Sequence, residues 1–141
     1  MAAFTLMELL IVIVIIGILS IVVAPRFSSS SEFSGRAAAS ELVSHLRYAQ
    51  QLAMNNTAKS VRVIIGSQSV SIEQNLSPIL SPQGDSYPHS FADQGVTFSP
   101  TATLTFNSSG EVSAATTIAV TPSAGQQVCI ESTGYAWLCD V

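Results

Sequence analysis

Hydrophobic residues are unevenly spread along the chain. Residues 4–24 form one apolar run in which Glu8 is the only charged residue. With a rise of about 1.5 Å per residue, a helix of this length crosses a hydrocarbon core of about 30 Å. The chain from Pro25 onward is rich in Ser, Thr, Gln and Asn. The pattern therefore predicts two parts: an N-terminal helix of membrane length and a globular domain with a polar surface.

The first part of that domain has helical periodicity. Between residues 32 and 55 the apolar positions recur at spacings of three, four and one: Ala38, Ala39, Leu42, Leu46, Ala49 and Ala53. Such spacing places them on one face of an amphipathic helix. We expect this face, together with Tyr48, to pack against a sheet, and the helix to end near Asn55.

From residue 59 the pattern alternates with a period of two, which is typical of strands. The strands are expected at 61–65, 69–73, 96–98, 104–106, 117–121, 127–131 and 135–139. Turn residues at 66–67 and 132–134 predict two hairpins. Residues 75–95, which are rich in Pro and Gly, are expected to form a long surface loop. The predicted fold is α+β: a long N-terminal helix packed on a C-terminal antiparallel sheet.

Composition narrows the range of partners. Hydrophobic residues make up 48% of the chain and charged residues 10%, whereas an average soluble protein has about 25% charged residues. The chain has five Lys and Arg residues and nine Asp and Glu residues, which gives a net charge of −4. A nucleic-acid interface needs a basic face, so no contact with nucleic acid is inferred.

The two cysteines, Cys129 and Cys139, lie near the C-terminus. They could form a disulfide, act as a redox pair or remain as buried thiols. Their spacing is not C-x-x-C, and no nearby His or Cys completes a zinc set. The predicted final hairpin places them on adjacent strands, so a disulfide is favoured if the compartment is oxidising.

Candidate chemistry is sparse. We expect His45 on the amphipathic helix and His89 in the Pro-rich loop to be surface or edge residues, not catalytic ones. Tyr135 and Trp137 could form a binding surface, but packing in the core or on a sheet face is expected. No catalytic residue, metal ligand or cofactor site is assigned, and the chain is interpreted as non-enzymatic.

The N-terminal run does not fit a cleavable secretory signal, because it is too long and lacks a basic leader. Residues 3–12, Ala-Phe-Thr-Leu-Met-Glu-Leu-Leu-Ile-Val, resemble the class III leader junction of type IV prepilins and type II secretion pseudopilins. The resemblance implies cleavage by a prepilin peptidase between Ala3 and Phe4 and methylation of the Phe4 amine. It also implies that Glu8, one turn further on, neutralises the amine of a neighbouring subunit during assembly.

Two residues extend the resemblance, and two features depart from it. Gly17 and Pro25 lie where helix-weakening residues occur in this family; alternatively, Gly17 is a packing notch and Pro25 marks the membrane exit. Ala3 replaces the usual Gly, and residues 1–3 carry no basic side chain. We therefore expect either a longer native leader or a topology set by the export machinery against the charge count.

The later chain adds weaker similarity. Residues 46–53, the first hairpin, residues 104–110 and the last strand-turn-strand unit look like minor pilins and pseudopilins of the FimT and GspH kind. Residues 24–27 and 33–35 look more like pilins of the mannose-sensitive haemagglutinin (MSHA) system. Together they imply a leader remnant at 1–3, a transmembrane and assembly helix at 4–27, and a pilin domain at 28–141 with its helix at 32–55 and its sheet at 59–141.

The function implied by the resemblance is that of a type IV pilus subunit, a minor pilin that initiates the filament or takes part in adhesion. Its implied partners are other pilin subunits, the prepilin peptidase, an inner-membrane platform with its ATPase, and lipid before assembly. The implied location is the inner membrane with a periplasmic domain, and then the filament. A minor pseudopilin of type II secretion and an anchored periplasmic binding protein that never polymerises are the alternatives.

Overall fold

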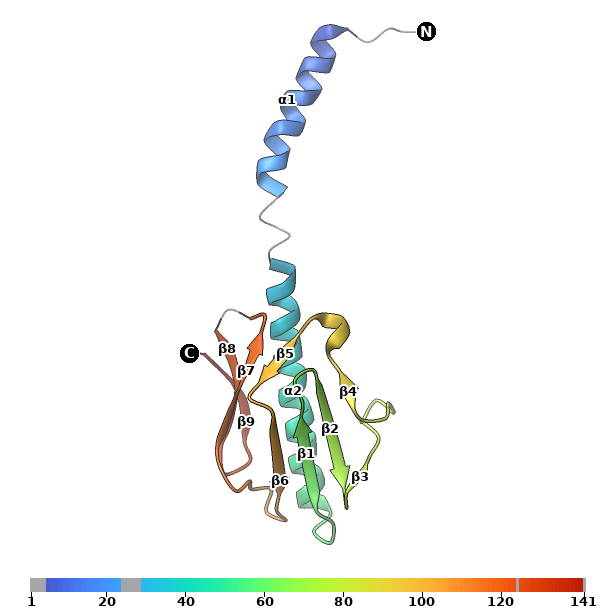
Figure 1. Cartoon of the computed structure of the whole chain (residues 1–141), viewed down its shortest axis with the longest axis vertical. Helices are drawn as coiled ribbons and strands as arrows, with labels where there is room; N and C mark the ends of the chain where they lie inside the picture. Colours follow the sequence, from blue (N-terminus) through green and yellow to red (C-terminus); the bar gives the residue numbers. More distant parts are fainter. Residues whose placement is uncertain (1–4, 24–28, 124, 141) are drawn as a thin grey trace. The chain divides into compact units, whose positions relative to one another are not determined.

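The computed structural model of the 141-residue chain describes residues 5–23, 29–123 and 125–140. The chain divides into two compact units, Met1–Ser30 and Ser31–Val141, and each is described by itself (Figure 1). The predictions for Ala3, Phe4 and Pro25 lie outside the described residues.

The first unit contains helix α1, Leu6–Val23. Thr5 precedes the helix, and its Oγ1 accepts a hydrogen bond from the amide of Glu8 at 3.2 Å. This is one half of a capping box, because a Thr side chain satisfies an amide that has no partner within the first turn. Within the described part of the chain, no helix is both long enough and apolar enough to cross a membrane.

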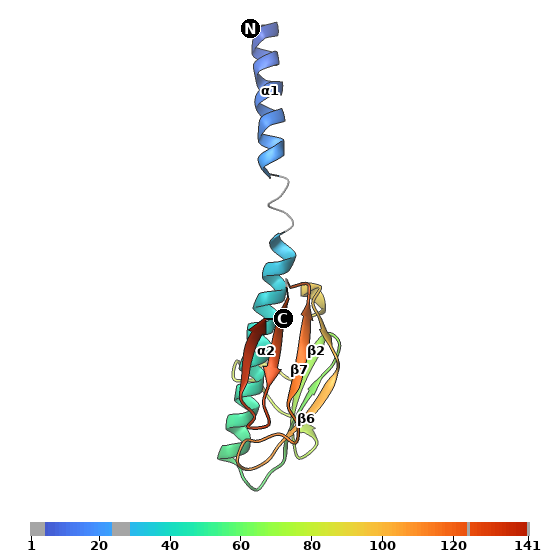
Figure 2. The same ribbon diagram turned by 90° about the vertical axis from the view of Figure 1, so that its left-hand side faces the viewer.

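Helix α2, Ser29–Asn55, ends at the predicted residue and begins three residues earlier than predicted. Its buried hydrophobic side chains are the predicted positions and Val43: Ala38, Ala39, Leu42, Val43, Leu46, Ala49 and Ala53. Figure 2 shows α2 running along one face of the strands. The many alanines on this face leave room for the strands to approach the helix axis closely.

The strands form two antiparallel sheets. The first has the order β3-β2-β1-β6, with β4 also paired to β2, and the second has the order β5-β7-β8-β9. The strands of the first sheet are β1 Val61–Ile65, β2 Ser69–Gln74, β3 Ser77–Pro78, β4 His89–Ser90 and β6 Ala102–Phe106. Those of the second are β5 Thr97–Ser99, β7 Thr116–Thr121, β8 Gln126–Ile130 and β9 Ala136–Asp140.

The predicted strands and both hairpins are confirmed, since β1 pairs with β2 and β8 with β9. The single predicted sheet is instead split in two between β5 and β6. Only Pro100 and Thr101 separate these strands in sequence, yet β5 pairs with β7 and β6 pairs with β1. A proline has no amide to donate to a ladder, so pairing is interrupted at this point.

The structure of segment 75–95 differs from the sequence prediction. It was expected to be a surface loop, but it contains β3, β4 and a short 3₁₀ helix, η2 Ala92–Gln94. Tyr87 is 5% exposed and Phe91 is fully buried. The prolines and glycines mark the turns correctly, but the aromatic residues between them cover the core.

Candidate functional site

Two of the predicted assembly residues are described in α1. Glu8 lies in the first turn and its side chain is exposed. Gly17 is also exposed, and a Cβ built on it would meet no atom within 4 Å. No described residue of this chain therefore packs into the space left by the missing side chain of Gly17.

The apolar side chains of α1 are exposed to a degree that is unusual for a folded protein. The large side chains described between Leu6 and Ile18 expose from 43% (Val12) to 82% (Leu6) of their surface. A contiguous apolar surface of this kind marks a site of contact with protein or lipid. This surface surrounds the helix, because exposed residues occur at every position from Leu6 to Ile18.

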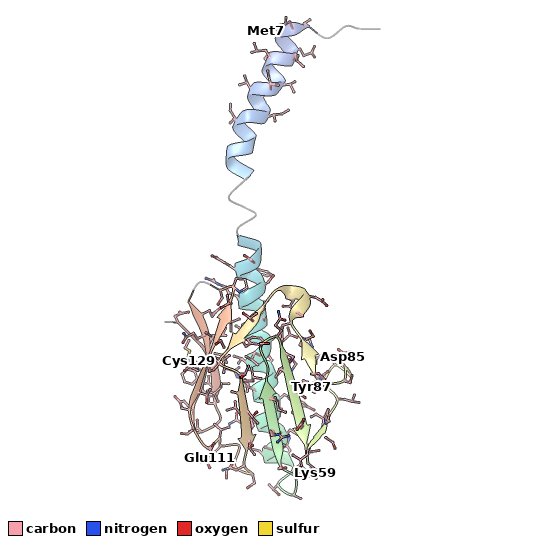
Figure 3. All side chains as sticks on the ribbon, in the orientation of Figure 1. Met7, Lys59, Asp85, Tyr87, Glu111 and Cys129 are labelled. Atoms are coloured by element: carbon pink, nitrogen blue, oxygen red, sulfur yellow. A yellow bond between two sulfur atoms is a disulfide. The ribbon has the colours of Figure 1, made fainter. Side chains whose placement is uncertain are left out.

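The predicted disulfide is present. Cys129 on β8 and Cys139 on β9 are bonded, with their Cα atoms 5.9 Å apart. The two residues are diagonal neighbours, because Cys129 is directly opposite Trp137 and Cys139 is opposite Gln127. The bond therefore fastens β9, the last strand of its sheet, to β8; Figure 3 marks the position of Cys129.

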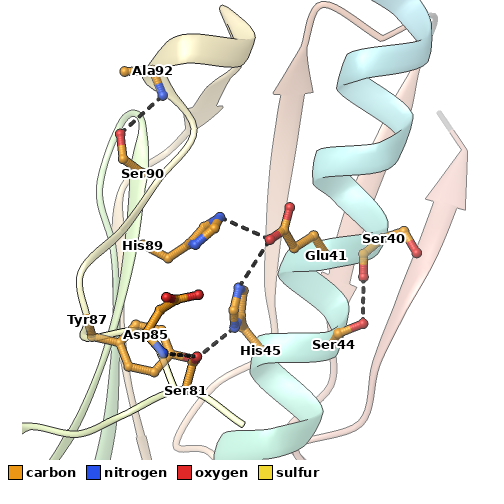
Figure 4. Close-up of polar contacts among 10 residues, drawn as sticks. All are labelled: Ser40, Glu41, Ser44, His45, Ser81, Asp85, Tyr87, His89, Ser90 and Ala92. Carbon is orange, nitrogen blue, oxygen red and sulfur yellow. Dashed lines mark hydrogen bonds and ion pairs between the residues drawn. The ribbon is translucent and has the colours of Figure 1, made fainter. Parts of the chain in front are cut away.

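A polar cluster that the sequence did not predict lies between α2 and β4 (Figure 4). Glu41 and His45 are one turn apart on α2, and His89 comes from β4. Glu41 Oε1 is 2.9 Å from His89 Nε2 and 3.8 Å from His45 Nε2. On the other side of its ring, His45 Nδ1 is 2.8 Å from the Tyr87 hydroxyl.

Aromatic packing holds the two imidazoles in place. The His45 and His89 ring centroids are 5.2 Å apart, and His89 makes an edge-on contact with Phe91 at 4.8 Å. Phe91 in turn packs edge-on against Phe98. Since Phe91 and Phe98 are core residues, the orientation of His89 is coupled to the hydrophobic core.

Burial shifts the pKa values of His45 and Tyr87. It lowers the pKa of His45, His89 lowers that pKa further, and Glu41 opposes both effects. His45 is thus neutral at pH 7, and its 3.8 Å approach to Glu41 is not an ion pair there. Burial, followed by the effects of Tyr48 and Glu41, raises the pKa of Tyr87 to about 12. Tyr87 therefore remains a neutral hydroxyl beside a neutral imidazole.

The prediction that His45 is a surface or edge residue was wrong. His45 is 7% exposed, and its ring lies beside a carboxylate. The sequence already indicated that His45 lies beside a carboxylate, because Glu41 and His45 are separated by four positions and so share one helix face. The contribution of His89 could not be read from the sequence, because it depends on how the segment 75–95 folds against α2.

The described residues of the second unit line at least two pockets. One, of about 470 Å³, adjoins the cluster and is lined by Ala37, Ser40, Glu41, Ser44, His45, Tyr48, Pro82 and Gln83. The other, of about 550 Å³, lies beside the loop after β6. Its carboxylate, Glu111, already accepts a hydrogen bond from Asn107 at 2.9 Å. The first pocket has at its wall the Nε2 atom of His45, which makes no hydrogen bond within the described residues.

Tyr135 and Trp137 stack on each other at 5.7 Å, and the Arg47 guanidinium lies 5.5 Å from the Tyr135 ring. Tyr135 is 52% exposed. The two rings therefore pack on each other while Tyr135 faces solvent, and their packing on a sheet face stays a prediction.

Comparison with known proteins finds solved structures with a similar fold. No family model matches the chain, and no curated protein matches it in sequence. Two crystal forms of the type IV minor pilin FimU of Pseudomonas aeruginosa match in structure, with TM-scores of 0.55 and 0.53 and 21% identity. Each match covers 74% of this chain and 87% or 91% of FimU. The chain thus has a type IV minor pilin-like α+β fold.

Proposed function

We propose that this protein is a structural subunit of a type IV pilus, a minor pilin whose role is structural and not catalytic. The observation that carries the proposal is the likeness to FimU, which spans 74% of this chain. The exposed apolar surface of α1 supports it independently, because a filament core formed from packed helices would bury that surface.

The proposed assembly mechanism uses the first turn of α1. Cleavage before Phe4 would leave a cationic amine at the start of the mature chain, one helical turn from Glu8. In a helical stack, the amine of one subunit can then approach the Glu8 carboxylate of the next. Pairing the charges removes the cost of leaving either one alone in apolar surroundings. Gly17 and Pro25 would allow the helix to lose local structure as the subunits pack.

Before assembly, the proposed location is the inner membrane, crossed once, with the Ser31–Val141 unit in the periplasm. A prepilin peptidase, a platform protein and an ATPase would process and extract the subunit. Residues 24–27 and 33–35 support an MSHA-like system, in which this chain would resemble the C-type minor pilin and act in initiation or adhesion. The disulfide fits an oxidising compartment.

The test is incorporation into filaments sheared from native cells. We expect wild-type protein in the sheared fraction, with a mature chain that begins at N-methylated Phe4 by mass spectrometry. Glu8→Gln, which keeps shape and removes charge, should lower incorporation at least about tenfold while the membrane-bound pool persists. Glu32→Gln, in the first turn of α2, is the matched control.

An unprocessed N-terminus, or equal incorporation of Glu8→Gln and wild type, would contradict the proposal. Wild-type protein that remains cell-bound under conditions that release the filaments would support the non-polymerising binding protein instead. Filaments that form only when a type II secretion system is overproduced would identify a pseudopilin.

A further inference from the structure

We propose that Glu41, His45 and His89 form a binding site for a divalent transition-metal ion, with Zn²⁺ as the ion that the donor set fits best. The three side chains come from α2 and β4, and one ligand atom of each lies within 4.8 Å of the other two. The site does not depend on filament assembly, because all of its residues belong to the Ser31–Val141 unit.

The spacing of the donor atoms is close to that of a zinc site. Ligands bound to a tetrahedral zinc at about 2.0–2.2 Å are about 3.3–3.5 Å from one another. Glu41 Oε1 lies 2.9 Å from His89 Nε2 and 3.8 Å from His45 Nε2. These two distances bracket the expected value, and all three ligand atoms lie within 4.8 Å of one another, so side-chain shifts of about an ångström would bring all three to bonding distance.

The imidazole nitrogens lack the partners that buried polar atoms require. Nε2 of His45 and Nε2 of His89 are shielded from solvent, and neither makes a hydrogen bond within the described residues. The 2.9 Å approach of His89 to Glu41 is close, but it does not have hydrogen-bond geometry. Burying such atoms without partners costs free energy. A cation among the three side chains would satisfy all of them together.

The contact between His45 and Tyr87 is compatible with the tautomer that a metal needs. With the proton on Nδ1, His45 donates to the Tyr87 hydroxyl at 2.8 Å. Nε2 then keeps its lone pair, and Figure 4 shows this nitrogen on the side of Glu41. Ligating histidines commonly donate their second N–H to an oxygen in this way, which fixes the ring orientation. Tyr87 is therefore a positioning residue for the site.

The donor set also argues for the kind of ion. Two imidazoles with one carboxylate suit Zn²⁺, whereas Ca²⁺ and Mg²⁺ prefer sites made of oxygen ligands. Three protein ligands leave a fourth position for water, and the 470 Å³ pocket lined by Glu41 and His45 provides access to it. A bound ion would link α2 to the segment that carries β4, so it would stabilise the domain.

The experiment uses the full chain in detergent, purified without a polyhistidine tag and treated with a chelator. Titration with zinc chloride is followed by calorimetry, and Co²⁺ serves as a spectroscopic probe of tetrahedral coordination. We expect one Zn²⁺ per chain, a melting temperature that rises with zinc concentration, and no competition from Ca²⁺. Glu41→Gln and His89→Gln should each weaken zinc binding at least about tenfold.

Asp93→Asn on η2 is the control, because it removes an exposed carboxylate outside the cluster. Glu41 and His89 are about one-third exposed, so their variants should fold, and circular dichroism without metal checks this. If either variant unfolds, Glu41→Asp, which shortens the side chain but keeps the carboxylate, should bind zinc more weakly than wild type. The proposal is overturned if wild type binds no Zn²⁺, or if the double variant Glu41→Gln/His89→Gln binds it as tightly as wild type.

Discussion

His45 on α2 and Tyr87, 42 positions later in the sequence, are joined by a buried hydrogen bond of 2.8 Å between Nδ1 and the hydroxyl oxygen. Both residues are at least nine-tenths buried, and their rings meet edge-on at 5.5 Å. The pair ties the helix to the segment 75–95. It also determines which nitrogen of His45 faces Glu41 and His89.

Tyr87→Phe should destabilise the metal-free protein by about 1–3 kcal/mol, because it leaves a buried nitrogen without its partner. It should also weaken zinc binding by roughly 10–100-fold, as expected when a ligating histidine loses its orienting group. Urea unfolding and zinc titration measure the two effects. Tyr135→Phe, at an exposed tyrosine, is the control. If Tyr87→Phe has the same free energy of unfolding and the same zinc affinity as wild type, the Tyr87 hydroxyl does not orient His45.

Gly35 gives the second prediction. A Cβ at this position would lie 1.7 Å from the carbonyl oxygen of Pro122, in the connection between β7 and β8. Gly35→Ala therefore requires a shift of the backbone, and overpacking of this kind costs about 1–3 kcal/mol or more. We expect a lower urea midpoint for the domain. Gly17→Ala, where nothing lies within 4 Å, should leave the midpoint unchanged.

Leu76 is held in a conformation that leucine disfavours. Asn75 and Leu76 connect β2 to β3 with φ angles of 53° and 67°, and a left-handed residue with a Cβ costs about 1–2 kcal/mol. The two-residue turn is one for which Asn-Gly is preferred. Leu76→Gly should therefore raise the free energy of unfolding by up to about 1 kcal/mol. Leu80→Gly, at another exposed leucine without a positive φ, should lower it.

The disulfide closes a short loop, since its cysteines are ten positions apart. Chain-entropy arguments assign about 2–3 kcal/mol to a loop of this size. The double variant Cys129→Ser/Cys139→Ser should lose this amount in urea unfolding, and a reducing agent should destabilise wild type by a similar amount. The reducing agent should have no effect on the double variant. Equal unfolding midpoints for wild type and the double variant would mean that the β8–β9 pairing alone holds the edge strand.

Local patterns predicted the elements well. The spacing of Ala38, Leu42 and Leu46 defined the buried face of α2 because a helix brings such positions onto one side. The alternation from Val61 onward located the strands because each strand buries every second residue. The final hairpin placed Cys129 near Cys139. Each of these predictions depends only on residues that are close together in the sequence.

The division into two sheets and the burial of Tyr87 and Phe91 were not predictable in the same way. Strand alternation specifies which side chains face inward, but not which strand is the partner, and β5 and β6 take different partners on either side of Pro100. In segment 75–95, prolines and glycines signalled turns. Whether the aromatic residues between those turns face solvent or the core depends on the space that α2 and the strands leave.

The sequence by itself determined the apolar N-terminal helix, the periods of the helix and strands that follow it, and the position of the cysteine pair, because these depend on residues close together in the chain. The tertiary structure alone decided that His89 approaches Glu41 and His45 and that Tyr87 orients His45. Those contacts join side chains more than forty positions apart, and they exist only because β4 pairs with β2 and the segment packs on α2. Only the four-position spacing of Glu41 and His45 is visible in the sequence, and the contacts of His89 and Tyr87 have no spacing by which they could be recognised.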